Sequence, residues 1–145
     1  MNRKSFNLEI KAVNEDGFFS GYGAVFGNVD WYNDIILPGA FKQTLNDWTT
    51  KGKYPPVLWN HSTNEPIGVY TKMIEDEKGL YVEGKLLIND VPRAKATHAL
   101  LKAGAIDGMS IGYRTIKSSY NESTDIRELI QLGLDEISIV TMPAN

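Results

Sequence analysis

The chain has 145 residues, a length that fits one domain able to bury a core of its own. Its net charge of -3 provides no basic surface for a nucleic-acid backbone, and no apolar run is long enough to span a membrane, so neither nucleic acid nor a membrane is an expected partner. The absence of cysteine excludes disulfides, thiolate metal sites and a cysteine nucleophile.

The N-terminal part of the chain predicts two strands, a loop and a short helix. Apolar and polar residues alternate over residues 6–12, which is typical of a half-buried strand, and a second strand over residues 18–26 completes a hairpin. The Asn- and Asp-rich segment 27–39 predicts a loop. Apolar residues at i, i+4 and i+7 in segment 41–48 predict a helix.

The middle of the chain predicts a short strand followed by a hairpin. Residues 57–61 predict a strand that ends in two polar residues, and residues 62–66 predict a turn. Strands are expected over residues 67–75 and 80–87, because a turn-forming Asp-Glu-Lys-Gly segment separates them.

A second helix is predicted up to about Lys102. Asn89 or Asp90 is the expected cap, and Pro92 fits the first turn. Gly104 stands where a left-handed residue commonly ends a helix.

The C-terminal part predicts three more strands, over residues 109–116, 126–132 and 136–140. Most of the predicted strands are joined by hairpins rather than by helices, which argues against alternating βα units. We therefore expect a mainly β fold with flanking helices, in which an antiparallel sheet of about seven strands is curled into a barrel.

A serine between two glycines is the first candidate for catalysis. The segment 108–112, GMSIG, has the G-x-S-x-G spacing of a nucleophile elbow, which requires a helix after the serine and a histidine later in the chain. The residues after Ser110 alternate as in a strand, and both histidines of the chain, His61 and His98, precede it. An α/β-hydrolase with unpermuted chain order is therefore excluded.

A serine nucleophile still needs a base, and the two histidines are the candidates. His98 lies in the middle of a predicted helix without other site-like residues, which favours a structural role. His61 stands where a predicted strand opens into a loop, a position that often presents catalytic side chains. Position alone leaves open whether His61 is a base or a hydrogen-bonded turn residue.

A carboxylate that orients the imidazole would complete a triad. In the strand around residues 134–140, Glu136 and Ser138 point to one face and the isoleucines between them to the other. Glu136 can reach His61 if the last strand lies beside the strand that ends at His61. Taken by itself, a solvent-facing glutamate is the simpler interpretation.

Four blocks of sequence, in consistent order and spacing, add a second line of argument. They are GYGAVFGNVD with DIILPGAF, PVLWNH with PIGV, ALLKAGAIDGMSIGYR, and LDEISIVTMPAN. Together, from about Gly21 to Asn145, they resemble the prohead (procapsid maturation) proteases of tailed bacteriophages. The segment Trp31–Asn33 departs from the smaller residues that many relatives carry.

The resemblance implies a serine endopeptidase with Ser110 as nucleophile, His61 as general base and Glu136 as third member. It also implies a fold similar to that of the herpesvirus assembly proteases, a barrel surrounded by helices. Those enzymes use a second histidine as third member, but His98 lies outside any matching block, which favours Glu136. We expect neither a cofactor nor a metal.

The expected substrate is the scaffold or capsid-precursor protein, and also the chain itself, within the assembling procapsid in the bacterial host cytoplasm. A homo-oligomer such as a dimer is expected by analogy with the family, because an uncontrolled protease would harm the host. We expect a single prohead protease domain over residues 1–145, with truncation at the C-terminus as an open alternative.

Other interpretations remain open. The chain would also suit a non-catalytic capsid-assembly or β-barrel binding module, or an esterase-like hydrolase that uses the same three residues. Arg114 is either a donor to the oxyanion of the reaction or an arginine of the strand surface. Asp30 and Asp34 fit a capped loop better than a metal site.

Overall fold

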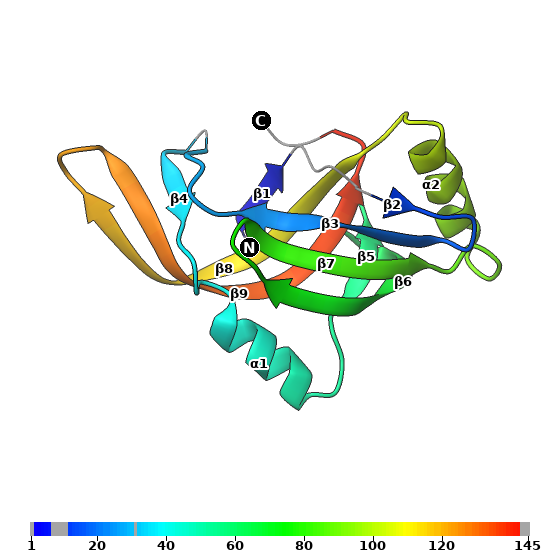
Figure 1. The fold of residues 1–145 in the computed structure, drawn as a ribbon, viewed down its shortest axis with the longest axis horizontal. Coiled ribbons are helices and arrows are strands. Elements are labelled where there is room, and N and C mark those ends of the chain that lie inside the picture. Colours follow the sequence, from blue (N-terminus) through cyan, green and yellow to red (C-terminus); the bar gives the residue numbers. More distant parts are fainter. Residues whose placement is uncertain (1, 7–11, 31, 143–145) are drawn as a thin grey trace.

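A computed structural model describes residues 2–6, 12–30 and 32–142, and Figure 1 shows them as a curled sheet with two helices packed against it. The strands of these residues are β1 (Asn2–Phe6), β2 (Ala12–Val13), β3 (Phe18–Val25), β4 (Asp34–Ile36), β5 (Pro56–Trp59), β6 (Ser62–Glu75), β7 (Gly79–Leu86), β8 (Gly108–Asn121) and β9 (Ile126–Val140). The helices are α1 (Lys42–Thr50) and α2 (Pro92–Lys102).

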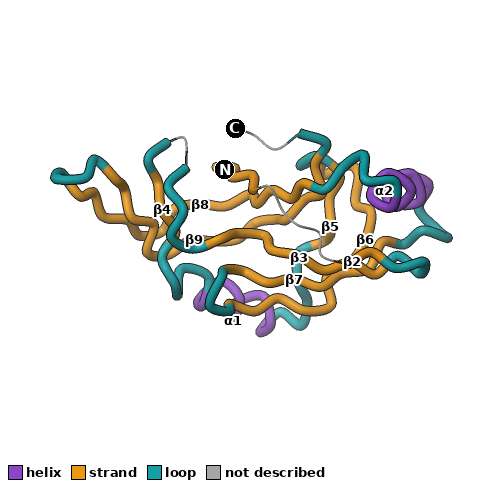
Figure 2. Tube along the Cα trace, turned by 45° about the horizontal axis from the view of Figure 1, so that its top comes forward, coloured by secondary structure: helices purple, strands orange, loops and turns teal. Residues whose placement is uncertain are grey.

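The sheet has the strand order β1-β8-β9-β5-β6-β7-β3-β2, and β4 pairs with β9 outside this path. Neighbouring strands are antiparallel except at β9, where both β4 and β5 pair in parallel. The predicted antiparallel sheet is therefore wrong in this respect, because the sheet is mixed. The mainly β fold with two helices is confirmed, and Figure 2 shows how the sheet curls into a half-barrel.

The two parallel pairs explain why the sequence patterns were misleading. A hairpin leaves a local turn signal, whereas parallel strands are joined by long connections that carry no such signal. Between β5 and β9 the chain passes through two further strands, a helix and β8. Strand β4 lies in the segment predicted as a loop, where three residues are too few for a clear alternation.

Several local predictions are confirmed and others are wrong. The strands predicted over residues 126–132 and 136–140 are one strand, β9. Both helices and the β6–β7 hairpin are present, and Gly104 has the left-handed φ of 75° that ends α2. The turn predicted at residues 62–66 is instead the beginning of β6. The residue that precedes α2 is Val91, without a side-chain cap, so Asn89 and Asp90 are not the cap. Most of the strand predicted over residues 6–12 lies outside the described residues.

The core lies inside the curl, between β8 and β9 on one wall and β3 on the other. Ile111 of β8 and Ile137 of β9 are fully buried. They face Gly23 of β3, where an added Cβ would lie 3.0 Å from the Cδ1 atom of Ile137. A larger residue at this position would push the two walls apart, so Gly23 is needed for their close approach.

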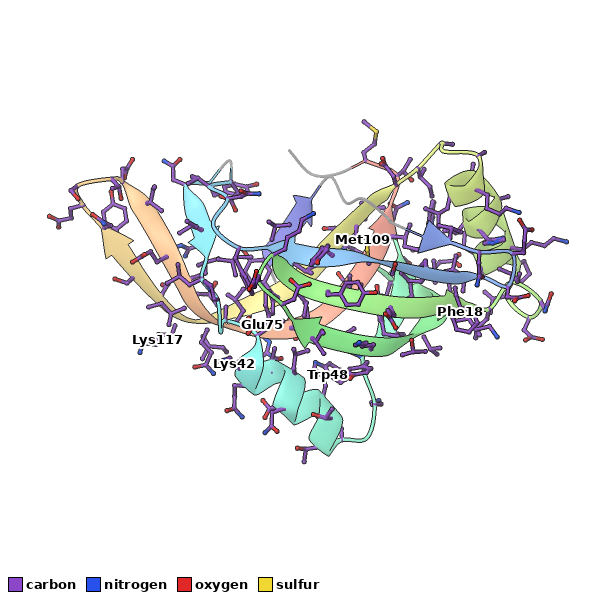
Figure 3. All side chains as sticks on the ribbon, in the orientation of Figure 1. Phe18, Lys42, Trp48, Glu75, Met109 and Lys117 are labelled. Carbon is purple, nitrogen blue, oxygen red and sulfur yellow. The ribbon has the colours of Figure 1, made fainter. Side chains whose placement is uncertain are left out.

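Helix α1 packs against the outside of the sheet and is tied to β9. The indole Nε1–H of Trp48 donates to the carbonyl oxygen of Leu134 at 2.9 Å, and the backbone N–H of Leu134 donates to Thr44 Oγ1 at 2.9 Å. Figure 3 shows Glu75 beside the start of this helix, where its Oε1 accepts the backbone N–H groups of Gly39 and Phe41. These contacts fix the part of β9 that leads into the candidate site.

In the described ranges, neither helix has the length and hydropathy that a membrane crossing requires.

Candidate active site

The pairing of β8 with β9 puts three polar side chains on one face of the sheet. Ser110 lies directly opposite Ser138, and Glu136 lies opposite Gly112. Directly opposite residues of an antiparallel pair point to the same face, as do residues two apart on one strand. Ser110, Glu136 and Ser138 therefore share the face that turns away from the buried isoleucines of these strands.

The third strand of the site, β5, runs parallel to the same stretch of β9, with Leu58 paired to Ser138. It ends at Trp59, which pairs with Ser62 of β6, so that only Asn60 and His61 connect the two strands. Both connecting residues are left-handed, with φ of 47° and 62°. This is the backbone of a type I′ hairpin turn, whose second central position is usually glycine.

His61 thus occupies a position where a side chain costs free energy. A left-handed conformation of a residue with a Cβ atom costs roughly 1–2 kcal/mol relative to the right-handed form. Such strained residues tend to occur where function depends on them. The turn carries the imidazole from the end of β5 across to the polar face of β8 and β9.

Asn60 holds the turn against the end of β9. Its Oδ1 accepts the backbone N–H of Thr141 at 2.9 Å, and its Nδ2 donates to Thr141 Oγ1 at 3.2 Å. Asparagine also tolerates the left-handed conformation better than most residues. The side chain therefore supports both the conformation of the turn and its position.

We expect Asn60→Ala to lower the free energy of unfolding by more than Asn60→Gly does. Both changes remove the bonds to Thr141, but only alanine keeps a Cβ atom in the left-handed region. The difference should be about 1 kcal/mol, measured by urea denaturation. Equal stability of the two variants would mean that backbone strain in this turn is small.

The imidazole of His61 joins the other two groups. Its Nδ1 is hydrogen-bonded to Glu136 Oε1, and its Nε2 lies 2.7 Å from Ser110 Oγ. A carboxylate can only accept, so Nδ1 carries the proton and Nε2 offers its lone pair to the serine hydroxyl. The tautomer required for removing the proton of Ser110 follows from this arrangement.

Ser138 connects the backbone of the histidine to the same carboxylate. Its Oγ accepts the backbone N–H of His61 at 2.9 Å and donates to Glu136 Oε2 at 2.6 Å. Each oxygen of the carboxylate therefore accepts a hydrogen bond. The strand alternation predicts that Ser138 lies on the same face as Glu136, but the sequence assigns Ser138 no role. Its position two residues from Glu136 on one strand is the signal that could have indicated their hydrogen bond.

We expect Ser138→Ala to lower kcat for peptide hydrolysis by about tenfold or more with little change in KM. The variant leaves the half-buried N–H of His61 and one oxygen of Glu136 without this partner, which costs roughly 1–3 kcal/mol. A merely structural role would lower the melting temperature but leave the turnover of the folded fraction unchanged. Comparing kcat per folded molecule separates these two outcomes.

The site is withdrawn from solvent. Ser110 is 0% exposed and Glu136 is 4% exposed, and the side chain of His61 is 10% exposed. Hydrogen bonds and charges act more strongly in such surroundings than in water.

Beneath the site, Tyr70 donates to the carbonyl oxygen of Ile137 at 3.0 Å. Burial, and secondly the charge of Glu136, raise the pKa of Tyr70 well above its usual range, so it remains a neutral donor.

The other candidate residues have structural positions. His98 is buried, and its Nε2 bonds to the carbonyl oxygen of Asn14 at 2.7 Å, which joins α2 to the turn before β3. Arg114 is paired with Asp135, and its side chain is 60% exposed. Since it lies four residues beyond Ser110 on the same strand, roughly 13 Å away, the surface role is favoured over a donor to the oxyanion.

The acidic loop before β4 is held together by its own bonds. Asp30 Oδ1 accepts the backbone N–H groups of Tyr32 and Asp34, and the carboxylate of Asp34 receives two bonds from Arg127. These contacts support the interpretation as a capped loop. In the part of the chain that the structure describes, His, Asp and Glu side chains form no group of three or more suited to a metal ion.

The sequence of the chain is similar to those of known proteins. Residues 6–145 match the family model described as caudovirus prohead serine protease. The chain is 42% identical to the prohead protease of Enterobacteria phage HK97 over 94% of its length, and 34% identical to that of Escherichia phage T5 over 80%. It spans 61% and 53% of these relatives' own lengths.

A solved structure supports the fold assignment separately. The structure of the bacteriophage T4 capsid assembly protease superposes with a TM-score of 0.75, covering 96% of both chains at 10% sequence identity. At this identity the likeness concerns the fold alone. The sequence match over nearly the whole chain shows the relationship: the chain belongs to the caudovirus prohead serine protease family.

Proposed function

We propose that the chain is a serine endopeptidase in which Ser110 is the nucleophile, His61 the general base and Glu136 the group that orients the imidazole. The observation that carries this proposal is the bridge of the His61 ring between the Ser110 hydroxyl and the Glu136 carboxylate. Membership of the family supports it. A binding module without catalysis would have no need for a strained, buried histidine in this arrangement.

The first half of the reaction is acylation. The Ser110 oxygen attacks the carbonyl carbon of the scissile peptide bond while its proton passes to His61 Nε2. The imidazolium that forms keeps its Nδ1–H bonded to Glu136, whose negative charge stabilises it. The same ring then gives the proton to the leaving amine, which completes the acyl-enzyme.

The second half is hydrolysis of this ester. His61, neutral again, takes a proton from a water molecule that attacks the acyl carbon, and returns the proton to the Ser110 oxygen as the new carboxyl product leaves. Glu136 takes up no proton in either half of the reaction, and its two hydrogen bonds hold it in place. No cofactor or metal is needed for any of these steps.

The proposed substrates are the scaffold or capsid-precursor protein and the chain itself, inside the assembling procapsid of the phage. This rests on the names of the relatives, which include two prohead proteases and a capsid polyprotein of Pseudomonas phage PAJU2 that is 28% identical over 99% of this chain. A homo-oligomer, such as a dimer, remains a prediction from family analogy.

The test combines a protein substrate with a serine-directed probe. The chain is incubated with the proposed substrate, the capsid precursor of the same phage. Products are identified by mass spectrometry, and a fluorophosphonate is used to trap the nucleophile. We expect defined cleavage products and a single adduct on Ser110. Cleavage of small esters without any cleavage of protein would favour the esterase alternative, and an adduct on another serine would remove Ser110 from its proposed role.

A further inference from the structure

The edge of β8 beside the candidate nucleophile is already occupied by another segment of the chain. Strand β1 pairs antiparallel with β8, and the register places Ser5 opposite Ser110, with Lys4 opposite Ile111 and Phe6 opposite Met109. The other edge of β8 belongs to β9, which carries Glu136 and Ser138. Strand β1 therefore fills the one edge of this strand that the site leaves open.

An extended polypeptide can bind a protein by adding a strand to such an edge, because its backbone supplies the hydrogen bonds whatever its sequence. At the edge of β8 an added strand would run directly beside the residue proposed to attack it. The chain's own N-terminal segment shows that a strand fits there, in antiparallel direction and centred on Ser110. The edge thus has the geometry required for an endopeptidase substrate.

Two further observations concern β1 itself. It is five residues long and forms the end of the sheet, with β8 as its only strand partner among the described residues. The match to the family model begins at residue 6, so four of the five residues of β1 lie outside it. Ser110 is 0% exposed, and a substrate carbonyl cannot reach its Oγ without displacement of a neighbouring group.

We infer that the edge of β8 from Met109 to Tyr113 is the binding site for an extended substrate polypeptide, and that β1 is an internal competitor that must leave before substrate binds. This inference rests on the proposed function for the nature of its ligand. Strand β1 then acts as an autoinhibitory segment, and its release makes the edge available. A short end strand held by one neighbour is suited to this, because its pairing is weak compared with that of the central strands.

The register provides a matched pair of variants in the full chain. Along a strand, backbone N–H groups point alternately toward and away from the neighbouring strand. The N–H groups of Arg3 and Ser5 point to one side of β1, and those of Asn2 and Lys4 point to the other side. Proline at either pair removes the N–H groups on that side only. One double variant therefore loses bonds to β8, while its twin, which also loses one basic and one uncharged polar residue, does not.

Binding is measured first, in a Ser110→Ala background, so that cleavage plays no part. The probe is a fluorescently labelled synthetic peptide with the sequence of residues 1–12. We expect the double variant with the broken ladder to bind it at least tenfold more tightly than its twin and than the unmodified N-terminus, by fluorescence anisotropy. Equal binding by all three chains, or no binding by any of them, would overturn the inference.

The same two double variants are then compared with Ser110 intact. The variant with the broken ladder should cleave the capsid precursor at least five times faster than its twin, and hydrogen exchange of the amides from Met109 to Tyr113 should rise only in that variant. Changed binding without any proteolysis would contradict the proposed function and leave the edge site standing. Proteolysis in every chain with unchanged binding and exchange would contradict the edge site and leave the proposed function standing.

Discussion

Ser110→Ala should lower the rate of precursor cleavage by about ten-thousandfold or more, because the alanine methyl group cannot form the acyl-enzyme. The loss should appear in kcat, since contacts with distant parts of the substrate are unchanged. Cleavage is followed by gel electrophoresis of the precursor and by mass spectrometry of its products. The fluorophosphonate adduct should disappear in parallel.

The control for this variant is its folding. Alanine removes the hydroxyl that bonds to His61 Nε2, which should cost roughly 1–2 kcal/mol of stability at this buried position. Circular dichroism at the assay temperature should therefore show a folded protein. A folded Ser110→Ala chain that still cleaves at more than a tenth of the original rate would rule out Ser110 as the nucleophile.

Glu136→Gln should lower kcat by roughly ten-thousandfold while leaving the shape of the site nearly unchanged. The amide has the size of the carboxylate but can present an N–H group toward His61 Nδ1. The ring would then place its proton on Nε2 and no longer accept the proton of Ser110. It would also lack the negative charge that stabilises the imidazolium.

Glu136→Asp is the matched comparison, because it keeps the charge and withdraws the carboxylate by one methylene group. We expect its rate to lie between those of the original chain and Glu136→Gln. The protonation state of the ring can be followed directly, since nitrogen chemical shifts distinguish the two neutral tautomers. Retention of the Nδ1–H tautomer in Glu136→Gln, together with full activity, would contradict the role of Glu136.

Strand β1, as the internal competitor, limits the activity that both experiments can measure. If β1 occupies the substrate edge in the isolated chain, basal cleavage will be slow, and the range over which a variant can lose activity will be small. Introducing Ser110→Ala and Glu136→Gln into the double variant with the released strand should restore this range. Regulation by a segment of the same chain would also provide control of activity without a second protein.

The sequence predicts the local setting of the site residues but not their contacts. The position of Ser110 at the beginning of a strand rather than in an elbow was readable from the alternation after it, and β8 confirms this. A strand end near His61 was also readable, although the predicted strand ran to His61 and β5 ends at Trp59. The contact between them was not, because the two residues are 49 positions apart and His61 and Glu136 are 75 apart.

The sequence by itself determined many of the local features: both helices, most of the strands, the two-residue periodicity of β8 and β9, the candidate residues, and through the four sequence blocks the family. These depend on side-chain patterns within about ten residues. Tertiary structure alone decided that β5 lies parallel to β9, that Asn60 and His61 form a left-handed turn, that Ser138 supports the histidine, and that β1 covers the edge of β8. Pairings between distant strands depend on how the whole core closes, and no short stretch of sequence encodes that.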